Sequence, residues 1–370
     1  MSGFLKERWR AIGLLWAVWF YFLIYAQFGL LHLMEASLDG PQLKWVLGSM
    51  ALSGVAGALF AAYAFREAWG NRMIFVSFLV AGLTAILATV CQTMPAFTLV
   101  AALTGLSLGV LTVAVVGYLP WACPFSHIGL TAGLATGLAY WFCNLPPVFD
   151  ASPRVHCWMA GLAGILALGF LPGIRGTGTW GSWQAIQSRV RGWGSLLPWT
   201  VLAFLVLIWS DSAAFADIQQ TSGLKSASWG GSAQLLGFGV IHCLAAMAAG
   251  EWMDRYAPRL LYLGSFACLF LGYLLIGRHG LGVIGGALYV AGVSAYSTAL
   301  VSFAALERDP LRIARGTGWV FAIAGWLGSA MGIGMVDDLG RVPILFWLLA
   351  FAALGLAIFV PLARKGVKQS

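Results

Sequence analysis

Asp211 is the residue whose type and position most clearly indicate chemistry. It occurs in the run Trp209–Ser210–Asp211–Ser212, well inside an apolar stretch at 197–218. In a helix rising about 1.5 Å per residue, that position is roughly 20 Å from the start of the stretch. A carboxylate this deep among apolar residues is costly to keep charged, so it could bind a proton, a sodium ion or a cationic solute. The alternative is a carboxylate in a water-filled vestibule, hydrogen-bonded to Ser210 or Ser212.

Six further polar side chains inside apolar stretches are candidates for contacting a solute or an ion, because such groups are costly to bury without a role. They are Tyr25, Gln27, Asn144, Gln234, His242 and Tyr296. His242 could change its charge near neutral pH, although a buried neutral histidine is the alternative. Asn144 precedes two prolines, so it could instead bond backbone groups that a kink frees.

Signals for enzymatic or metal chemistry are weak. The sequence contains no zinc-protease H-E-x-x-H motif and no P-loop, and its six cysteines include no C-x-x-C pair. Met331 and Met335 share a helix face and could hold copper(I), but ten methionines are ordinary packing residues in so apolar a chain. We therefore expect no catalytic residues, no bound metal and no cofactor.

The whole chain is strongly apolar. Of its 370 residues, 60% are hydrophobic and 9% charged, and the mean hydropathy is +0.86. Soluble proteins carry about 25% charged residues, so a soluble enzyme, a disordered chain and a nucleic-acid-binding module are excluded. A membrane-spanning helix needs about 20 mostly apolar residues. We expect an all-α polytopic membrane protein with twelve such helices, at 11–33, 43–64, 73–92, 96–118, 128–149, 155–173, 197–218, 230–250, 259–277, 281–304, 315–336 and 343–363.

The distribution of basic residues predicts the orientation of these helices. If the N-terminus is cytoplasmic, most of the 21 basic residues fall on the cytoplasmic side, as the positive-inside rule requires. We therefore expect both termini to be cytoplasmic and the net charge of +8 to reflect topology, with no nucleic-acid partner. The residues left outside are Lys44, Arg154, Lys225, Arg278 and Arg341.

A constant spacing between loops indicates an internal repeat. Glu67 and Asp254 are 187 residues apart, and so are Gly129 and Gly316. Two loop pairs with one offset, close to half the chain, predict a duplicated six-helix unit. We expect one six-helix bundle at 1–173, a cytoplasmic amphipathic linker at 174–196, and a second bundle at 197–370. The same repeat pairs Tyr25 with Asp211 at equivalent depth.

Two loops resemble a known family. The run Gly250-Glu-Trp-Met-Asp254-Arg255-Tyr-Ala-Pro-Arg259 is similar to the G-x-x-x-D-R-x-G-R-R loop of the major facilitator superfamily, with Ala257 at the second glycine. The earlier loop resembles a degraded copy, in which Glu67, Gly70 and Arg72 remain. Two features of many members are missing: Ala101 stands at the position of a helix-4 arginine, and helix 5 has no glycine-proline motif.

The resemblance implies two pseudo-symmetric bundles with a substrate site between them, opened alternately to either side. It further implies that charges in the cytoplasmic loops latch the halves in one conformation. The residues this assigns to gating are Asp254, Arg255, Arg259, Glu67 and Arg72, although simple topology-setting charge would also account for them.

We therefore expect a monomeric secondary transporter in a bacterial inner membrane. It would move a small organic solute, driven by a gradient or passively, with a proton or a sodium ion as the coupling ion. Its other partner would be the lipid bilayer. The alternative is a transport-inactive protein of the same fold that serves as a structural or assembly subunit of a larger membrane complex. The missing helix-4 arginine and the degraded first loop fit that alternative.

Overall fold

The computed structural model describes residues 2–173, 193–305, 307 and 309–366, and every regular element among them is a helix. Most of the amphipathic linker expected at 174–196 lies outside these residues. The expected all-α fold is confirmed. Among the described residues, eleven helices are long and apolar enough to cross a membrane, and a twelfth apolar helix, Ile128–Cys143, is shorter. The chain is therefore an integral membrane protein.

The helices before residue 174 begin with one long, locally widened span. It consists of α1 (Ser2–Tyr21), the π-helix η1 (Phe22–Gly29) and α2 (Leu30–Glu35). The remaining helices of this part are α3 (Gly40–Ala64), α4 (Glu67–Ala88), α5 (Met94–Ala122), α6 (Ile128–Cys143), α7 (Pro146–Phe149) and α8 (Pro153–Ala167), with the short 3₁₀ turns η2 (Phe125–His127) and η3 (Leu168–Gly173).

The helices after residue 192 include a second interrupted span. It consists of α14 (Pro310–Val320), the π-helix η5 (Phe321–Gly328) and α15 (Ser329–Leu339). Single π turns inside helices often lie at functional sites. The other helices are α9 (Trp193–Gln220), α10 (Ser222–Trp229), α11 (Ser232–Arg255), α12 (Arg259–Ile276), α13 (Gly282–Ala305) and α16 (Ile344–Gly366).

Two local differences from the expected spans have clear causes. The span expected at 128–149 is divided into α6 and α7, because Pro146 and Pro147 have no N–H to continue the helix. The short helix α10 lies between the spans expected at 197–218 and 230–250, in a segment for which the sequence predicts only a connecting loop. The segment is too polar and too short to be predicted as a membrane-spanning helix. Elsewhere most boundaries differ by a few residues, as is usual for helix ends. The largest difference is at the first span, where α1 begins at Ser2 instead of residue 11.

Several helices begin where a capping side chain is followed by proline. Asp39 accepts a hydrogen bond from the Gln42 N–H at the start of α3, and Asp309 accepts one from Leu311 N–H at the start of α14. Ser152 caps α8 in the same way through Val155 N–H. A side-chain oxygen satisfies an N–H that has no partner within the helix, and proline fits the first turn because it lacks that N–H.

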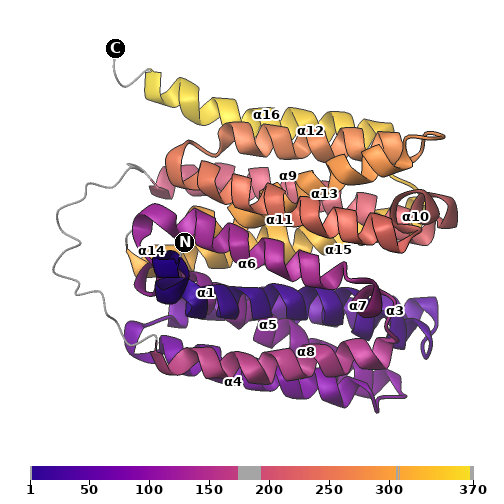
Figure 1. Ribbon diagram of the computed structural model, residues 1–370, viewed down its shortest axis with the longest axis horizontal. Coiled ribbons are helices and arrows are strands. Elements are labelled where there is room, and N and C mark those ends of the chain that lie inside the picture. The colour runs from indigo at the N-terminus through magenta and orange to yellow at the C-terminus, as the bar shows by residue number, and fades with distance from the viewer. Residues whose placement is uncertain (1, 174–192, 306, 308, 367–370) are drawn as a thin grey trace.

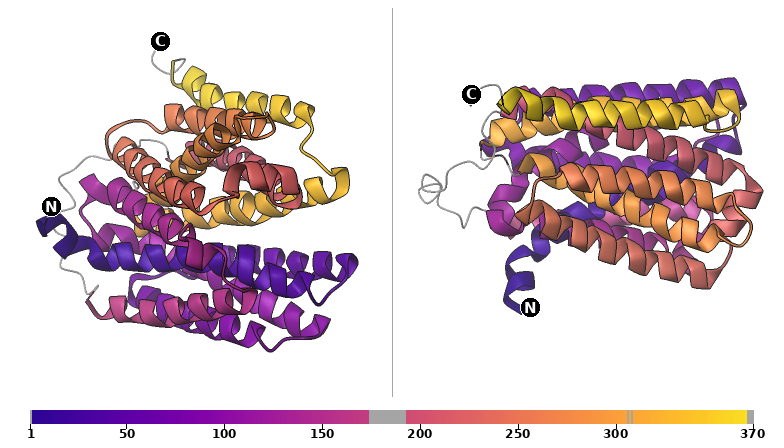
Figure 2. Two further views of the ribbon diagram at one scale, coloured as in Figure 1. Left: turned by 45° about the vertical axis from the view of Figure 1, so that its right-hand side comes forward. Right: turned by 90° about the horizontal axis from the view of Figure 1, so that it is seen from above.

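The helices gather in two groups that follow chain order (Figure 1), with α1 to α8 on one side and α9 to α16 on the other. Both described ends of the chain lie at the same end of the assembly, as the two further views agree (Figure 2). We call this the terminal end. The groups meet mainly where α6 packs on α11 and where α3 packs on α14 and η5.

Small residues allow the closest of these contacts. Gly129 on α6 and Gly250 on α11 face each other so closely that a Cβ on either would overlap the other's carbonyl oxygen. Gly133 similarly faces the carbonyl oxygen of Ala246. On the other contact, Gly54 of α3 lies directly under the Trp326 indole of η5. Small residues play this role in membrane helix pairs because water exclusion does not drive their association.

Candidate functional site

Asp211 is the centre of a polar cluster between the helices. Its side-chain carboxylate accepts hydrogen bonds from the hydroxyls of Tyr289 and Tyr296. Both tyrosines lie on α13, seven residues apart, which is about two helical turns and therefore one face. Both are buried, whereas Asp211 on α9 is only partly buried. The carboxylate is therefore held by two donors while it keeps some access from outside the packed core.

The cluster continues to a helix of the first group. The Tyr140 hydroxyl on α6 lies 3.2 Å from Ser297 Oγ on α13, and Ser297 follows Tyr296 in the chain. The Tyr140 ring stacks on the His242 ring of α11, with centroids 4.2 Å apart and planes 5° from parallel. We call these residues the central polar cluster: Asp211, Tyr289, Tyr296, Tyr140, His242, Ser294 and Ser297.

His242 is bonded within this cluster. Its Nδ1 lies 2.6 Å from Ser294 Oγ on α13, and the side chain is 4% exposed. Of the sequence candidates, the structure thus brings Asp211, His242 and Tyr296 together. Sequence reasoning missed Tyr140, Tyr289 and Ser294, since tyrosine and serine are unremarkable in apolar helices. The spacing of Tyr289 and Tyr296 on one face was the only available signal.

Tyr25 lies in a different cluster. Its hydroxyl donates to Thr84 O at 3.2 Å and accepts from Thr104 Oγ1 at 3.4 Å. Tyr21 donates nearby to Ala81 O at 2.7 Å. All of these residues belong to the first group of helices, and Tyr25 is fully buried. The structure therefore places Tyr25 and Asp211 in separate polar networks, and only the network of Asp211 includes residues of both groups.

The three remaining candidates lie outside the central polar cluster. Asn144 donates to Tyr140 O at 2.8 Å, and its Oδ1 is buried without a partner among the described residues. It also packs beside Gly239 of α11. The Oε1 atom of Gln234 is likewise buried and unpartnered within the described part of the chain. Gln27 lies on η1, where it is partly buried.

Asp254 joins the two groups at the terminal end. Its Oδ1 accepts from Gly129 N–H at 2.7 Å and its Oδ2 accepts from Leu130 N–H at 2.9 Å. These are first-turn N–H groups of α6, which have no partner within their helix and carry the positive end of the helix dipole. A carboxylate from α11 thus caps a helix of the other group. The close approach of Gly129 and Gly250 brings the carboxylate within reach.

The other gating candidates have different surroundings. Arg255 pairs with Glu251 on its own helix, and Arg259 begins α12 half-buried. Arg72 is exposed on α4, and the side chain of Glu67 lies outside the described part of the structure.

At the corresponding first-group loop, Arg66 is the residue that bonds the end of α3. Its guanidinium donates to Phe65 O at 2.8 Å and to Tyr63 O at 3.1 Å. Trp319 of α14 donates to Tyr63 Oη at 3.2 Å, which ties the two groups there.

The groups are also linked at the opposite end. Lys44 on α3 pairs with Asp338 on α15 at 2.9 Å. Phe28 of η1 contacts Phe215 of α9 edge-to-face, with centroids 6.4 Å apart. Contacts between the groups therefore exist at both ends and across the central polar cluster.

Metal binding and hydrolase chemistry have little support in the described residues. Among the described residues, no group of three or more His, Cys, Asp or Glu side chains is placed to hold a metal ion. Gly105–Gly109 matches the G-x-S-x-G spacing of hydrolase nucleophiles. However, its Ser107 lies inside α5 and donates to Thr104 O at 3.0 Å. Both glycines face the α3 backbone, so the motif serves helix contact instead of forming a sharp nucleophile turn.

Comparisons with known proteins give matches in structure only. No family model matches the chain, and no curated protein matches it in sequence. The proton:xylose symporter XylE with bound 6-bromo-6-deoxy-D-glucose has a TM-score of 0.68 at 14% identity, over 97% of this chain and 95% of its own. The E. coli fucose:proton symporter FucP has a TM-score of 0.64 at 15% identity, over 97% of this chain and 98% of its own.

These matches cover nearly all of both chains at low identity, so they concern the fold. XylE is described as a major facilitator superfamily protein, as is FucP in an outward conformation, which matches with a TM-score of 0.59. The resemblance drawn from the loops at 67–72 and 250–259 is thereby supported by an independent criterion. The chain has the fold of the major facilitator superfamily.

Proposed function

We propose that this protein is a secondary transporter that moves a small neutral organic solute across a membrane by alternating access, with Asp211 carrying a coupling proton. The observation that carries the proposal is the carboxylate of Asp211, held by two tyrosine hydroxyls on α13, a helix whose Ser297 hydroxyl contacts Tyr140 of the other group of helices. Ionisable groups inside membrane proteins usually belong to ion or solute pathways.

The composition of the central polar cluster supports a neutral solute and a proton. It contains one carboxylate, one histidine and five hydroxyl-bearing side chains. It contains no lysine or arginine that would pair with an anion. Hydroxyls can donate and accept, which suits a solute with hydroxyl or carbonyl groups. The two structural neighbours named above are sugar:proton symporters, which supports both the solute class and the coupling ion.

The proposed mechanism uses contacts between the groups. Ionised Asp211 accepts from Tyr289 and Tyr296, whereas a protonated carboxyl also donates and has fewer lone pairs for these hydroxyls. Protonation therefore loosens the α9–α13 contact, and Tyr140 passes that change to α6. Opening at the terminal end requires the Asp254 cap on α6 to break. Opening at the other end requires the Lys44–Asp338 pair to break.

A thermal-shift screen of purified protein tests the proposal. The panel contains monosaccharides, other neutral polar metabolites, and cations as a comparison. A ligand at about 100 times its dissociation constant stabilises the folded protein by about 2.7 kcal/mol. We expect a neutral, hydroxyl-bearing hit whose stabilisation is lost or reduced in Asp211→Asn and retained in Asp150→Asn, which changes an exposed carboxylate.

Two outcomes would contradict this proposal. A hit that survives Asp211→Asn unchanged would place the binding site elsewhere. No hit across the panel, together with a partner protein that co-purifies in mild detergent at fixed stoichiometry, would favour the transport-inactive subunit.

A further inference from the structure

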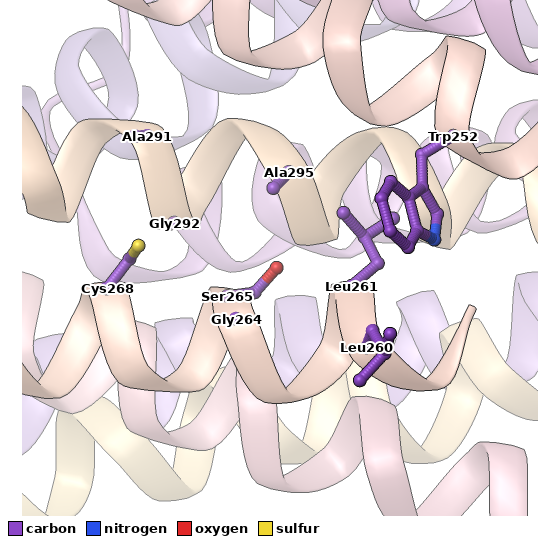
Figure 3. A pocket seen from close by; sticks show the side chains of 9 residues that line it. All are labelled: Trp252, Leu260, Leu261, Gly264, Ser265, Cys268, Ala291, Gly292 and Ala295. Carbon is purple, nitrogen blue, oxygen red and sulfur yellow. The ribbon is translucent and has the colours of Figure 1, made fainter. Parts of the chain in front are cut away.

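A groove on the outer face of the second group of helices has no role in the proposed transport cycle. It lies between α12 and α13, is capped at one end by α11, and has a volume of about 190 Å³. Its lining includes Trp252, Leu260, Gly264, Ser265, Cys268 and Ala295. None of the lining residues belongs to the central polar cluster. Figure 3 shows the Trp252 indole at one end, Cys268 toward the other, and the Ser265 hydroxyl between them, directed toward α13.

The groove runs along the membrane within one leaflet. All of its lining residues lie in three membrane-spanning helices, Ser232–Arg255, Arg259–Ile276 and Gly282–Ala305. From Leu260 to Cys268 the α12 axis advances about 12 Å, close to half of a hydrocarbon core about 30 Å thick. The groove thus begins near the terminal end and reaches about the midplane, so hydrocarbon chains of one leaflet are its natural neighbours.

Two polar groups mark the path that an occupant would follow. Ser265 is 2% exposed and its Oγ has no hydrogen-bond partner among the described residues. Arg259, next to Leu260 at the start of α12, is partly exposed and forms no ion pair within the described part of the chain. A buried hydroxyl without a partner is costly, and a guanidinium matches a phosphate group in geometry and charge.

We propose that the groove binds one acyl chain of a phospholipid whose phosphate group pairs with Arg259. The lining beyond Ser265, toward Cys268 and Ala291, contacts the methylene groups, each of which contributes favourably when buried. The Ser265 hydroxyl donates to an ester carbonyl of the same lipid. Trp252, whose Nε1 donates to Ala257 O at 3.2 Å, holds the loop that closes the mouth.

Native mass spectrometry of the full-length protein tests this proposal. Delipidated protein is titrated with dioleoyl phosphatidylglycerol, or with dioleoylglycerol, which has the same chains and no phosphate. We expect wild-type protein to retain one phosphatidylglycerol more tightly than other bound copies, and to prefer it over dioleoylglycerol by roughly threefold to fivefold, as expected of a partly exposed ion pair.

Two variants separate the two halves of the site. Gly264→Leu fills the groove, since nothing lies within 4 Å of a Cβ built there, and should abolish the tight copy of both lipids. Arg259→Gln should remove the preference for phosphatidylglycerol and leave dioleoylglycerol binding unchanged. The matched controls are Gly237→Leu, a glycine on α11 with equally open space, and Arg278→Gln, just beyond the opposite end of α12.

The proposal is overturned if Gly264→Leu retains the tight phosphatidylglycerol, or if Gly237→Leu loses it equally. It is also overturned if Arg259→Gln keeps the wild-type preference between the two lipids. Melting curves recorded by circular dichroism for every variant distinguish a loss of lipid binding from a loss of folding. Because the experiment measures lipid binding, this proposal can fail whether or not the protein transports a solute.

Discussion

At the scale of single residues, the central polar cluster contains a carboxylate satisfied by two hydroxyls from one helix face. Hydrogen bonds to a charged group contribute about 1.5–3 kcal/mol, more than those between neutral groups. Asp211 stood out in the sequence because a carboxylate is rare in an apolar stretch. Tyr140, Tyr289 and Ser294 did not, because their types are common there and only the packing of α6, α11 and α13 brings them together.

Removing one tyrosine donor should weaken this cluster. Tyr296→Phe leaves the ring in place and deletes the hydroxyl bonded to Asp211, so we expect a lower melting temperature and reduced solute binding. In the Asp211→Asn background, Tyr296→Phe should lower the melting temperature markedly less, because the tyrosine hydroxyl and the Asp211 carboxylate interact directly. The measurement is a double-mutant cycle of melting temperatures. Tyr262→Phe, at another buried tyrosine, is the control. An equal fall in melting temperature on Tyr296→Phe in both backgrounds would contradict the coupling.

Cys91 allows a test of orientation by its chemistry. It follows α4 outside the spanning segments and is partly exposed. With a cytoplasmic N-terminus, its loop faces outward, so a membrane-impermeant maleimide should label it in intact cells. Burial raises the pKa of its thiol above the usual value, so the reactive thiolate is scarcer at neutral pH and labelling should accelerate as pH rises from about 7 to 9.

The labelling experiment has a direct control in Cys91→Ser, which should lose the signal. Cys123 is buried at the opposite end and should react slowly in any orientation. Labelling of Cys91 only after the cells are permeabilised would show that the predicted orientation is inverted.

At the scale of elements, the contacts between the groups depend on helix ends and small residues. The sequence predicted the Asp254 loop as a latch, but not its partner, because a backbone N–H carries no sequence signature. The structure supplies it as the first turn of α6. The sequence also gave no sign of the π segments η1 and η5, since widening of a helix depends on its neighbours and not on residue type.

Breaking the Asp254 cap should shift the protein toward opening at the terminal end. Loss of a capping side chain costs about 0.5–2 kcal/mol, and about 1.4 kcal/mol changes an equilibrium tenfold. Asp254→Ala should therefore lengthen distances measured by electron paramagnetic resonance between spin labels on α6 and α11 at that end. Asp254→Asn should have a smaller effect, because asparagine can still accept one N–H.

Glu251→Gln is the control for this shift, because Glu251 pairs with Arg255 on its own helix and forms no ion pair with the first group among the residues that the structure describes. Identical distance distributions for wild type and Asp254→Ala would show that the cap does not hold the groups together.

The α6–α11 contact should tolerate no added volume. Gly250→Leu places a side chain against the backbone of Gly129, and overpacking of this kind costs about 1–3 kcal/mol. We expect a lower melting temperature than for Gly237→Leu, which lies on the same helix facing open space. Equal melting temperatures for the two variants would contradict the packing described.

At the scale of the whole molecule, sequence was sufficient for the class of protein and for its fold. Hydropathy alone predicts the spans, since the bilayer thickness fixes the helix length. The repeat and the loop at 250–259 indicated the superfamily fold, which XylE and FucP match over nearly the whole chain. Sequence could not indicate that the groups are linked at both ends, because such links depend on pairs such as Lys44 and Asp338, nearly 300 residues apart.

Asp211 is proposed to couple a proton to solute movement, and a measurement of proton flux tests that role. Protein is reconstituted in vesicles, and external pH is followed in weakly buffered solution after addition of the solute found by thermal shift. We expect wild-type vesicles to take up protons with the solute and alkalinise the medium, Asp211→Asn to abolish this flux, and Asp150→Asn to retain it. Solute-driven proton uptake by Asp211→Asn at the wild-type rate would show that Asp211 does not carry the coupled proton.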